Sequence, residues 1–573
     1  MEPPSAGTRR RRVIAWLAMA ATAAVLTVAF TAPYGSLNQQ TYLLDPLHRA
    51  MPELFRRDWF VGETPPYLPV FGWLAQWLYA IDPEGPVAVL AANFAVTFAT
   101  YAALYWLVTA VAPARGRVGF AGFVIVASFV TVTMGRAMGG NYLLAGYLQP
   151  LSLATLGWIA AMAALVRGRY RGCGAALALS GLLHVNYLVL GIGLFTLAAL
   201  ARRAGRRELA WLLVPQLVVL AVFLPDLVAA AGPSEQAVRI LVDFHAPGHY
   251  RAGRLISWIP PLAGWQLAGL AALPLVDDAR REARALWWFS LAAFAVSVAT
   301  ALLVRLPALE PLTQVRWSRI APFGQLACQV LVVAALVRQA SAPTRATARG
   351  SAPGSPAARS DAAQSAIPLR ASLARRAWAA AAIAAALLLN GRSLHTPWSV
   401  TMIAVAGVAA VLAVPQRPAR WAAAALAAVA LAVALWASPR GAGMTTVPDG
   451  SPGERALEDW ARTSTPTDAL FAAPPDLYGF RLLARRAVIA DTKSPPLQPA
   501  LLVPWYRRLC AMVDRPDVPT HEAVEQLWYQ LAPDQLARVA RAFDADYIIV
   551  AANTHLPGAP VYANAELAVY RAR

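Results

Sequence analysis

The sequence predicts a mainly α-helical membrane protein with about 12–13 spans and a small C-terminal α/β domain. First, 58% of the 573 residues are hydrophobic and only 14% are charged, whereas soluble domains carry about a quarter charged residues. Second, long apolar runs alternate with short arginine-rich connections, a pattern typical of cytoplasmic loops. Third, helical and strand-like segments begin to alternate near residue 440, which indicates a separate α/β domain.

The basic residues are spread along the chain in a way that argues against nucleic acid as a partner. The formal net charge is +19, but the charges lie in short clusters between apolar runs. Lys493 is the only lysine, so the composition favours arginine generally, and one arginine is weak evidence for a phosphate site. The three cysteines, Cys173, Cys328 and Cys510, lie far apart, and we expect no structural disulfide.

The N-terminal segment predicts a membrane anchor. Four arginines precede an apolar run at 13–31, which is long enough to span the roughly 30 Å hydrocarbon core. A cleaved signal peptide begins in the same way, but more spans follow. We therefore expect residues 1–12 in the cytoplasm and the polar stretch 34–68 as the first extracytoplasmic loop.

Further apolar runs predict a membrane domain over 13–338 and C-terminal spans over 377–438. A short helix at 68–81, with Trp73 and Trp77, suits the membrane interface. Single spans are expected at about 86–112, 118–134, 151–166, 209–231, 256–275, 286–304, 323–338, 377–391, 398–414 and 421–438.

The run 173–200 is too long for one ordinary span and too short for two. One crossing would place Arg202 and its neighbours outside, against the charge rule. We therefore expect two half-crossing helices, broken near His184, Val185 and Asn186, because broken helices at membrane depth are tolerated where they line a cavity. The alternative is one long tilted helix that violates the charge rule.

The stretch 339–376 is low in complexity and rich in Ala, Ser, Pro and Arg, which predicts a disordered cytoplasmic linker. Residues 439–573 are expected to form the extracytoplasmic α/β domain. Helices are predicted at 453–461 and 533–543. Strands are predicted at 468–473, 487–491, 547–552 and 565–570.

Candidate acids lie in the first loop. Asp45 and Asp58 come first, with Glu53 and Glu63 behind them, since a carboxylate at the membrane surface can act as a general base or hold a divalent cation. Two arginines precede Asp58 and two aromatic residues follow it, which predicts an anion-binding surface beside an acid. The alternative, that each is an ordinary solvated loop residue, is the default for any single acid.

Arginines expected outside the membrane oppose the topology rule and so need a reason. Arg136, Arg316 and Arg319 are such residues, and a guanidinium binds phosphate through a bidentate fork. The general bias toward arginine is an equally weighted alternative.

His245 and His249 have the spacing of a helical metal pair, but the Pro-Gly between them breaks that helix, so no metal is expected there.

The expected helix break also carries candidate residues for a substrate cavity, namely His184, Asn186 and Tyr187. Polar groups inside a membrane segment are costly and often functional. A core histidine with satisfied hydrogen bonds is the alternative.

Several short motifs carry a resemblance to a known family. They are NQQTYLLDP and RRDWF near the start, HVNY in the middle, and FRLLARRAVIADTKSPP, WYRR and FDADYIIV near the end. With the overall layout, they make the chain resemble a group of bacterial membrane proteins related to the class-C glycosyltransferase superfamily. The resemblance implies transfer of a sugar from a polyprenyl-phosphate carrier to an envelope acceptor, at the outer face of the inner membrane.

The resemblance also implies site residues. The superfamily commonly has an acid just after the first span, where this chain has the amides of residues 38–40. On the resemblance, Asp58 is the first choice for the acid and Asp45 the second, with a divalent cation as the one cofactor to consider. Arg316 and Arg319 are the candidates for the carrier phosphate. The alternatives are a non-catalytic lipid- or glycan-binding scaffold and, less favoured because no second half resembles the first, a transporter.

Overall fold

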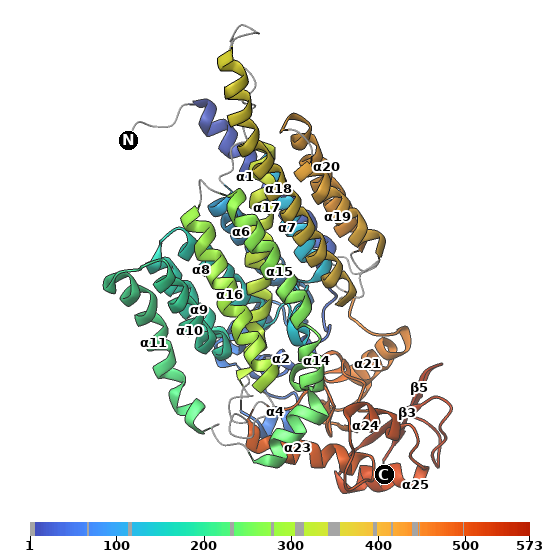
Figure 1. The fold of residues 1–573 in the computed structure, drawn as a ribbon. Coiled ribbons are helices and arrows are strands. Elements are labelled where there is room, and N and C mark those ends of the chain that lie inside the picture. Colours follow the sequence, from blue (N-terminus) through green and yellow to red (C-terminus); the bar gives the residue numbers. More distant parts are fainter. Residues whose placement is uncertain are drawn as a thin grey trace.

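The computed structural model describes residues 6–572 except 66–67, 113–116, 230–233, 277–279, 304–314, 342–355, 394–397, 414–415, 438–444, 446 and 497. Long helices form a bundle, and a small α/β domain covers one end of it (Figure 1). Helix α1 Ala6–Phe30 begins at the opposite end of the bundle. The predicted class, mainly helical with a small α/β domain, is confirmed.

Seven described helices are long and apolar enough to cross a membrane, and three shorter apolar helices accompany them. The chain is therefore a multi-pass membrane protein, and each expected span coincides with a helix. The helices are α1 Ala6–Phe30, α6 Pro86–Val111, α7 Arg117–Thr133, α8 Pro150–Val166, α9 Tyr170–Leu183, α10 Val185–Ala201, α11 Arg206–Ala229, α15 Ile259–Ala272, α16 Arg280–Leu303, α17 Ala321–Ser341, α18 Pro356–Ser393, α19 Trp398–Ala413 and α20 Gln416–Ala437.

The predicted break in the run 173–200 is confirmed. Helix α9 ends at Leu183 and α10 begins at Val185. His184 between them has extended backbone angles, φ −159° and ψ 99°. The break therefore consists of the single residue His184, whose side chain lies where α9 ends and α10 begins.

The stretch 339–376 is more helical than the linker predicted from its composition. Helix α17 continues to Ser341 and α18 begins at Pro356, and residues 342–355 lie outside the described part. Alanine and arginine have high helix propensity, which explains why this alanine-rich stretch can extend both neighbouring helices.

Short helices gather at the end of the bundle that faces the C-terminal domain. Asp58 caps α4, since its side chain accepts the Val61 N–H at 3.1 Å. Trp73 and Trp77 of α5 are 56% and 72% exposed, as expected for an interfacial helix. The short helices at this end are α2 Gln39–Tyr42, α3 Leu44–Ala50, α4 Trp59–Glu63, α5 Pro69–Ile81, η1 Met138–Gly140, α12 Glu235–Arg239, η2 Ile240–His245, α13 Pro247–Tyr250, α14 Ala252–Ile256 and η6 Trp317–Ile320. The 3-10 helix η3 Leu273–Leu275 follows the other end of α15.

The C-terminal domain is a five-stranded sheet with helices, in the order β2-β1-β3-β5-β4. Strands β2, β1 and β3 are parallel, and β5 runs antiparallel to both β3 and β4. All predicted helices and strands are present, while α22, α23, α24 and β4 were not predicted. The elements are α21 Pro452–Ser464, β1 Leu470–Ala472, α22 Phe480–Ala484, β2 Ala487–Val488, α23 Pro499–Met512, α24 His521–Trp528, α25 Pro533–Ala542, β3 Tyr547–Ala551, β4 Tyr562–Ala563 and β5 Leu567–Arg571.

One hydrophobic core joins the first loop to the C-terminal domain. Leu47 and Trp59 of the first loop belong to the same buried cluster as Ile489 and Trp505 of the domain. Phe244 of η2 enters this cluster and contacts Trp505 at a ring separation of 5.8 Å. The domain is therefore packed onto the membrane domain through apolar surface.

A cationic site between the membrane domain and the C-terminal domain

Cationic and imidazole side chains from separate segments meet at the end of the bundle that the C-terminal domain covers. We define the cationic site as Arg316, Arg319, His184, His249 and Lys493. They come from η6 and the residue before it, the α9–α10 break, α13 and the turn after β2. Contacts between η1 and η6, η1 and α13, and η2 and α23 bring these segments together.

Arg319 is held by the broken helix pair. Its guanidinium donates a hydrogen bond to Nε2 of His184. The His184 ring in turn contacts Tyr187 at 5.1 Å between centroids. Arg319 is half-buried, and no described carboxylate forms an ion pair with it. The predicted carrier-phosphate residue and two of the predicted cavity residues are thus adjacent.

Arg316 is positioned by its backbone and by a tyrosine. It has left-handed backbone angles, φ 46° and ψ 61°, an uncommon conformation for a residue other than glycine. Its Nε donates to the Tyr250 hydroxyl at 2.9 Å, and its guanidinium lies 5.6 Å from the centre of the same ring. The left-handed backbone of Arg316 therefore directs its side chain toward α13. Arg319 lies three residues further along the chain.

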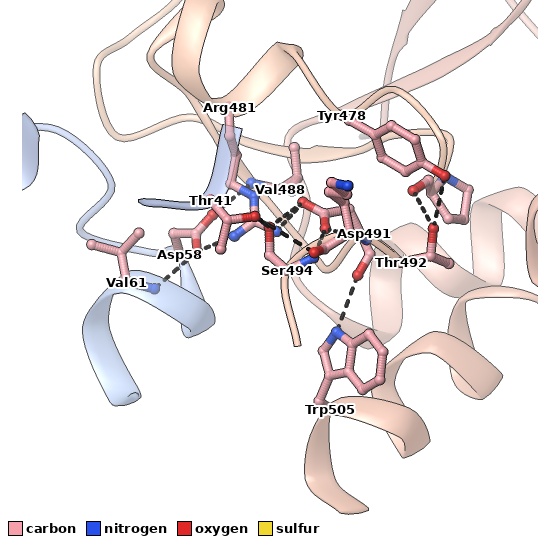
Figure 2. Close-up of polar contacts among 12 residues, drawn as sticks. Thr41, Asp58, Val61, Tyr478, Arg481, Val488, Asp491, Thr492, Ser494 and Trp505 are labelled. Atoms are coloured by element: carbon pink, nitrogen blue, oxygen red, sulfur yellow. Dashed lines mark hydrogen bonds and ion pairs between the residues drawn. The ribbon is translucent and has the colours of Figure 1, made fainter. Parts of the chain in front are cut away.

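Lys493 is carried by a turn that is fastened on two sides. Oδ1 of Asp491 accepts the N–H groups of Lys493 and Ser494, at 2.9 and 2.6 Å. The indole N–H of Trp505 donates to the Asp491 carbonyl at 3.0 Å. The hydroxyls of Ser494 and Thr41 are 3.0 Å apart, which ties the turn to the first loop (Figure 2).

Two histidines lie beside this turn. The His245 ring packs against Trp505 at 5.7 Å. Burial and, after it, the positive charge of Arg316 lower the pKa of His245 well below its usual range. The same two causes lower the pKa of His249 to about 3, and the charge of Lys493 also lowers both pKa values. Both rings are therefore neutral near pH 7. No pattern in the sequence indicated that these histidines lie near Lys493.

The amides of residues 38–40 fasten the beginning of the first loop. The Asn38 side-chain amide donates to Gln149 at 3.0 Å and to the Tyr142 hydroxyl at 3.4 Å. The Gln39 side chain accepts the Gly35 N–H at 2.9 Å. These amides therefore hold the first loop against the segment before α8.

Asp58, the first choice for the catalytic acid, is placed as a structural anchor. Its side chain is 0% exposed and pairs with Arg481 at 3.3 Å, and it also accepts the N–H groups of Val61 and Val488. Arg481 pairs on its other side with Asp491 (Figure 2). Burial raises the pKa of Asp58, although Arg481 opposes the rise. This enclosed position favours a structural role for Asp58 over direct contact with an acceptor.

Asp45 retains access to open space. It pairs with Arg49 at 3.0 Å, and its side chain is 29% exposed. It lines a small pocket together with Tyr42, Phe60 and Phe71. Thr41 lines the same pocket, and its hydroxyl lies 3.0 Å from that of Ser494, the residue after Lys493. The pocket of Asp45 therefore adjoins the cationic site through Thr41.

The remaining candidate residues from the sequence do not belong to the cationic site. Arg136 is exposed, and its guanidinium contacts the Met134 sulfur at 3.3 Å; the structure does not bring its side chain into the cationic site. Asn186 is half-buried on α10. Glu53 and Glu63 are exposed and lie outside the site.

A divalent cation does not fit this site. No group of three or more His, Cys, Asp or Glu side chains that could hold a metal occurs among the described residues. The positive charges of Arg316, Arg319 and Lys493 would repel a cation there.

A family model described as "Domain of unknown function (DUF6798)" matches residues 452–512. The matched segment includes Arg481, Asp491, Lys493 and Trp505, the residues of the turn after β2 and its supports. No curated protein matches the chain.

Two of the solved structures that match the chain are of one protein. ArnT from Cupriavidus metallidurans, described as bound to undecaprenyl phosphate, is 15% identical, with coverage of 97% of each chain and a TM-score of 0.47. The same protein in the apo state gives 15% identity, coverage of 99% of this chain and 98% of that chain, and a TM-score of 0.46.

A third structure is the archaeal oligosaccharyltransferase AglB from Archaeoglobus fulgidus, in complex with an inhibitory peptide and a dolichol-phosphate. It is 11% identical, with coverage of 93% of this chain and 69% of that chain and a TM-score of 0.43.

Proposed function

We propose that this protein transfers a sugar from a polyprenyl-phosphate carrier to an envelope acceptor, at the outer face of the bacterial inner membrane. The observation that supports this most is the half-buried guanidinium of Arg319, which has no carboxylate partner among the described residues. Burying a charge without a counter-ion is costly. A phosphate would supply the missing counter-ion, and the N-terminal end of α17 would add a favourable field for it.

Arg319 and Arg316 bind the carrier phosphate, and His184 holds the Arg319 guanidinium in place. Asp45 is the general base that takes the proton of the acceptor hydroxyl, because it lines a pocket that adjoins the cationic site. Asp58 holds the C-terminal domain in place and takes no part in the proton transfer.

The second candidate is a non-catalytic protein that binds the same lipid. The amides of residues 38–40, where the superfamily commonly has an acid, favour this alternative. The binder and the transferase differ in what Asp45 does. Asp45 is needed for turnover in a transferase and is dispensable for lipid binding in either protein.

Native mass spectrometry of the purified protein distinguishes the two candidates. We expect Asp45→Asn to retain polyprenyl phosphate carrying its sugar, while wild type and the matched control Glu53→Gln, an exposed acid of the same loop, carry mainly unloaded lipid. Equal loading in all three proteins would favour the binder. Absence of any such lipid, even when it is supplied, would contradict both candidates.

A further inference from the structure

Lys493 is a second half-buried cation that lacks an ion-pair partner. No described carboxylate lies within ion-pair distance of its amine. Asp491 is its neighbour in the turn, but the Asp491 carboxylate pairs with Arg481 and accepts two backbone N–H groups. Since a charge that is taken out of water is normally paired, an external anion is the expected partner of Lys493.

The position of Lys493 is built by both parts of the protein. Asp491 and Trp505 hold its turn within the C-terminal domain, and Thr41 holds the same turn from the first loop. Phe244, next to His245, contacts Trp505 and Tyr506 at ring separations of 5.8 and 4.9 Å. These contacts fix the turn of Lys493 from both parts of the protein.

Lys493 and Arg319 belong to one site but approach it from different sides. The His249 ring lies 6.5 Å from that of Tyr250, whose hydroxyl accepts a hydrogen bond from Arg316. The neighbouring His245 packs against Trp505, which holds the turn of Lys493. Arg319 comes from the helix break in the membrane domain, and Lys493 comes from the C-terminal domain. An anion that contacts both must therefore extend from the membrane domain toward the C-terminal domain.

We propose that Lys493, with His245 and His249, forms a second anion subsite beside Arg319, and that the site takes a polyprenyl carrier joined to its cargo through a diphosphate. This inference rests on the proposed function and names its donor class. A sugar linked through one phosphate carries one negative charge, whereas a diphosphate linkage carries a second negative charge. The phosphate nearer the lipid lies on Arg319, and the phosphate nearer the sugar lies on Lys493.

The neutral histidines suit the second subsite. A neutral imidazole donates one hydrogen bond and accepts another, so it can contact a phosphate oxygen without adding charge. Nδ1 of His249 is buried and has no hydrogen-bond partner among the described residues. Lys493 is thus the charged group of this subsite, and its removal should affect the second phosphate alone.

Binding titrations with two lipids test this inference. Purified full-length protein is titrated with a polyprenyl monophosphate and with the diphosphate of the same chain length. We expect wild type to prefer the diphosphate by about tenfold, the worth of one charge-assisted hydrogen bond. Lys493→Met should lose this preference and keep its monophosphate affinity. Lys493→Arg should retain much of the preference, and Arg515→Met, an exposed cation of the same domain, should behave as wild type.

The outcomes separate this inference from the proposed function. Equal affinity of wild type for the two lipids, or an equal loss of both in Lys493→Met, would overturn the diphosphate subsite and leave the carrier site intact. Binding of neither lipid to wild type would overturn both. Retained monophosphate binding by Lys493→Met also shows that the variant is folded.

Discussion

Arg319 donates a hydrogen bond to Nε2 of His184, the single residue that separates α9 from α10. An arginine is always a donor, so Nε2 is the acceptor and the His184 ring is neutral at this contact. The helix break therefore leaves Nε2 of His184 available as an acceptor, and this nitrogen fixes the direction of the Arg319 guanidinium.

Replacing His184 should weaken carrier binding through Arg319. We expect His184→Leu to lower the affinity for polyprenyl phosphate about tenfold, the worth of one charged hydrogen bond. His184→Gln offers an acceptor oxygen and should restore part of the loss. Titration with the lipid measures both effects. Equal affinity of His184→Leu and wild type would show that Arg319 does not depend on this contact.

Arg481 should be essential for docking the C-terminal domain onto the first loop. It lies between the carboxylates of Asp58 and Asp491, with side-chain exposures of 2%, 0% and 6%. Arg481→Met would leave two buried acids uncompensated, which costs about 3–5 kcal/mol. Thermal unfolding and hydrogen exchange over β1 and β2 of the full chain measure the loss.

A surface arginine provides the control for this prediction. Arg538 pairs with Asp514, and both side chains are exposed, at 56% and 43%. Arg538→Met should change stability by less than about 1 kcal/mol. If Arg481→Met were no more destabilising than Arg538→Met, the buried pairs would not hold the two parts together.

Glu458 should make stability dependent on pH. It is 5% exposed in α21, and burial, followed by the charge of Glu454, raises its pKa from 4.5 to about 9. Between these values the folded protein binds a proton that the unfolded chain has lost, so stability falls as the pH rises. Glu458→Gln should stabilise the protein at pH 8 by about 1–3 kcal/mol and have little effect at pH 4.5. An unchanged pH dependence of the melting temperature would contradict the raised pKa.

His249 should not control the pH dependence of carrier binding. Its pKa is lowered to about 3 by burial and by the charge of Arg316, so the ring stays neutral from pH 5 to pH 8. The lipid phosphate itself titrates near pH 6, and wild type should follow that midpoint. His249→Gln should give the same profile. A midpoint that disappears in His249→Gln would show that the ring is charged in this range.

Much of the fold follows from local patterns in the sequence. The break at His184 was predicted from the length of one apolar run and the charge of the loop that follows, and both are local properties. The strands around Phe471 and Ile549 were predicted from short apolar runs. Such features depend on residues that are close together in the sequence, so they can be predicted from the sequence alone.

The candidate site depends on contacts between distant residues, and these were only partly predicted. Arg319 and His184 were both named as candidates, but their contact joins residues 135 apart. Asp58 was the first choice for the acid because of its flanking arginines and aromatic residues and of the family resemblance, while its partner Arg481 lies 423 residues away. Lys493 was not assigned, since its place follows from how the first loop packs on the C-terminal domain.

The most direct test of the carrier site is the affinity of the purified protein for polyprenyl phosphate, measured for wild type, Arg319→Ala and Arg239→Ala. Arg239 is an exposed arginine paired with Glu235 and serves as the matched control. We predict that Arg319→Ala loses affinity by about 100-fold, as expected for a half-buried charged contact, and that Arg239→Ala binds as wild type does. Equal binding by all three proteins would contradict the assignment of the carrier phosphate to Arg319.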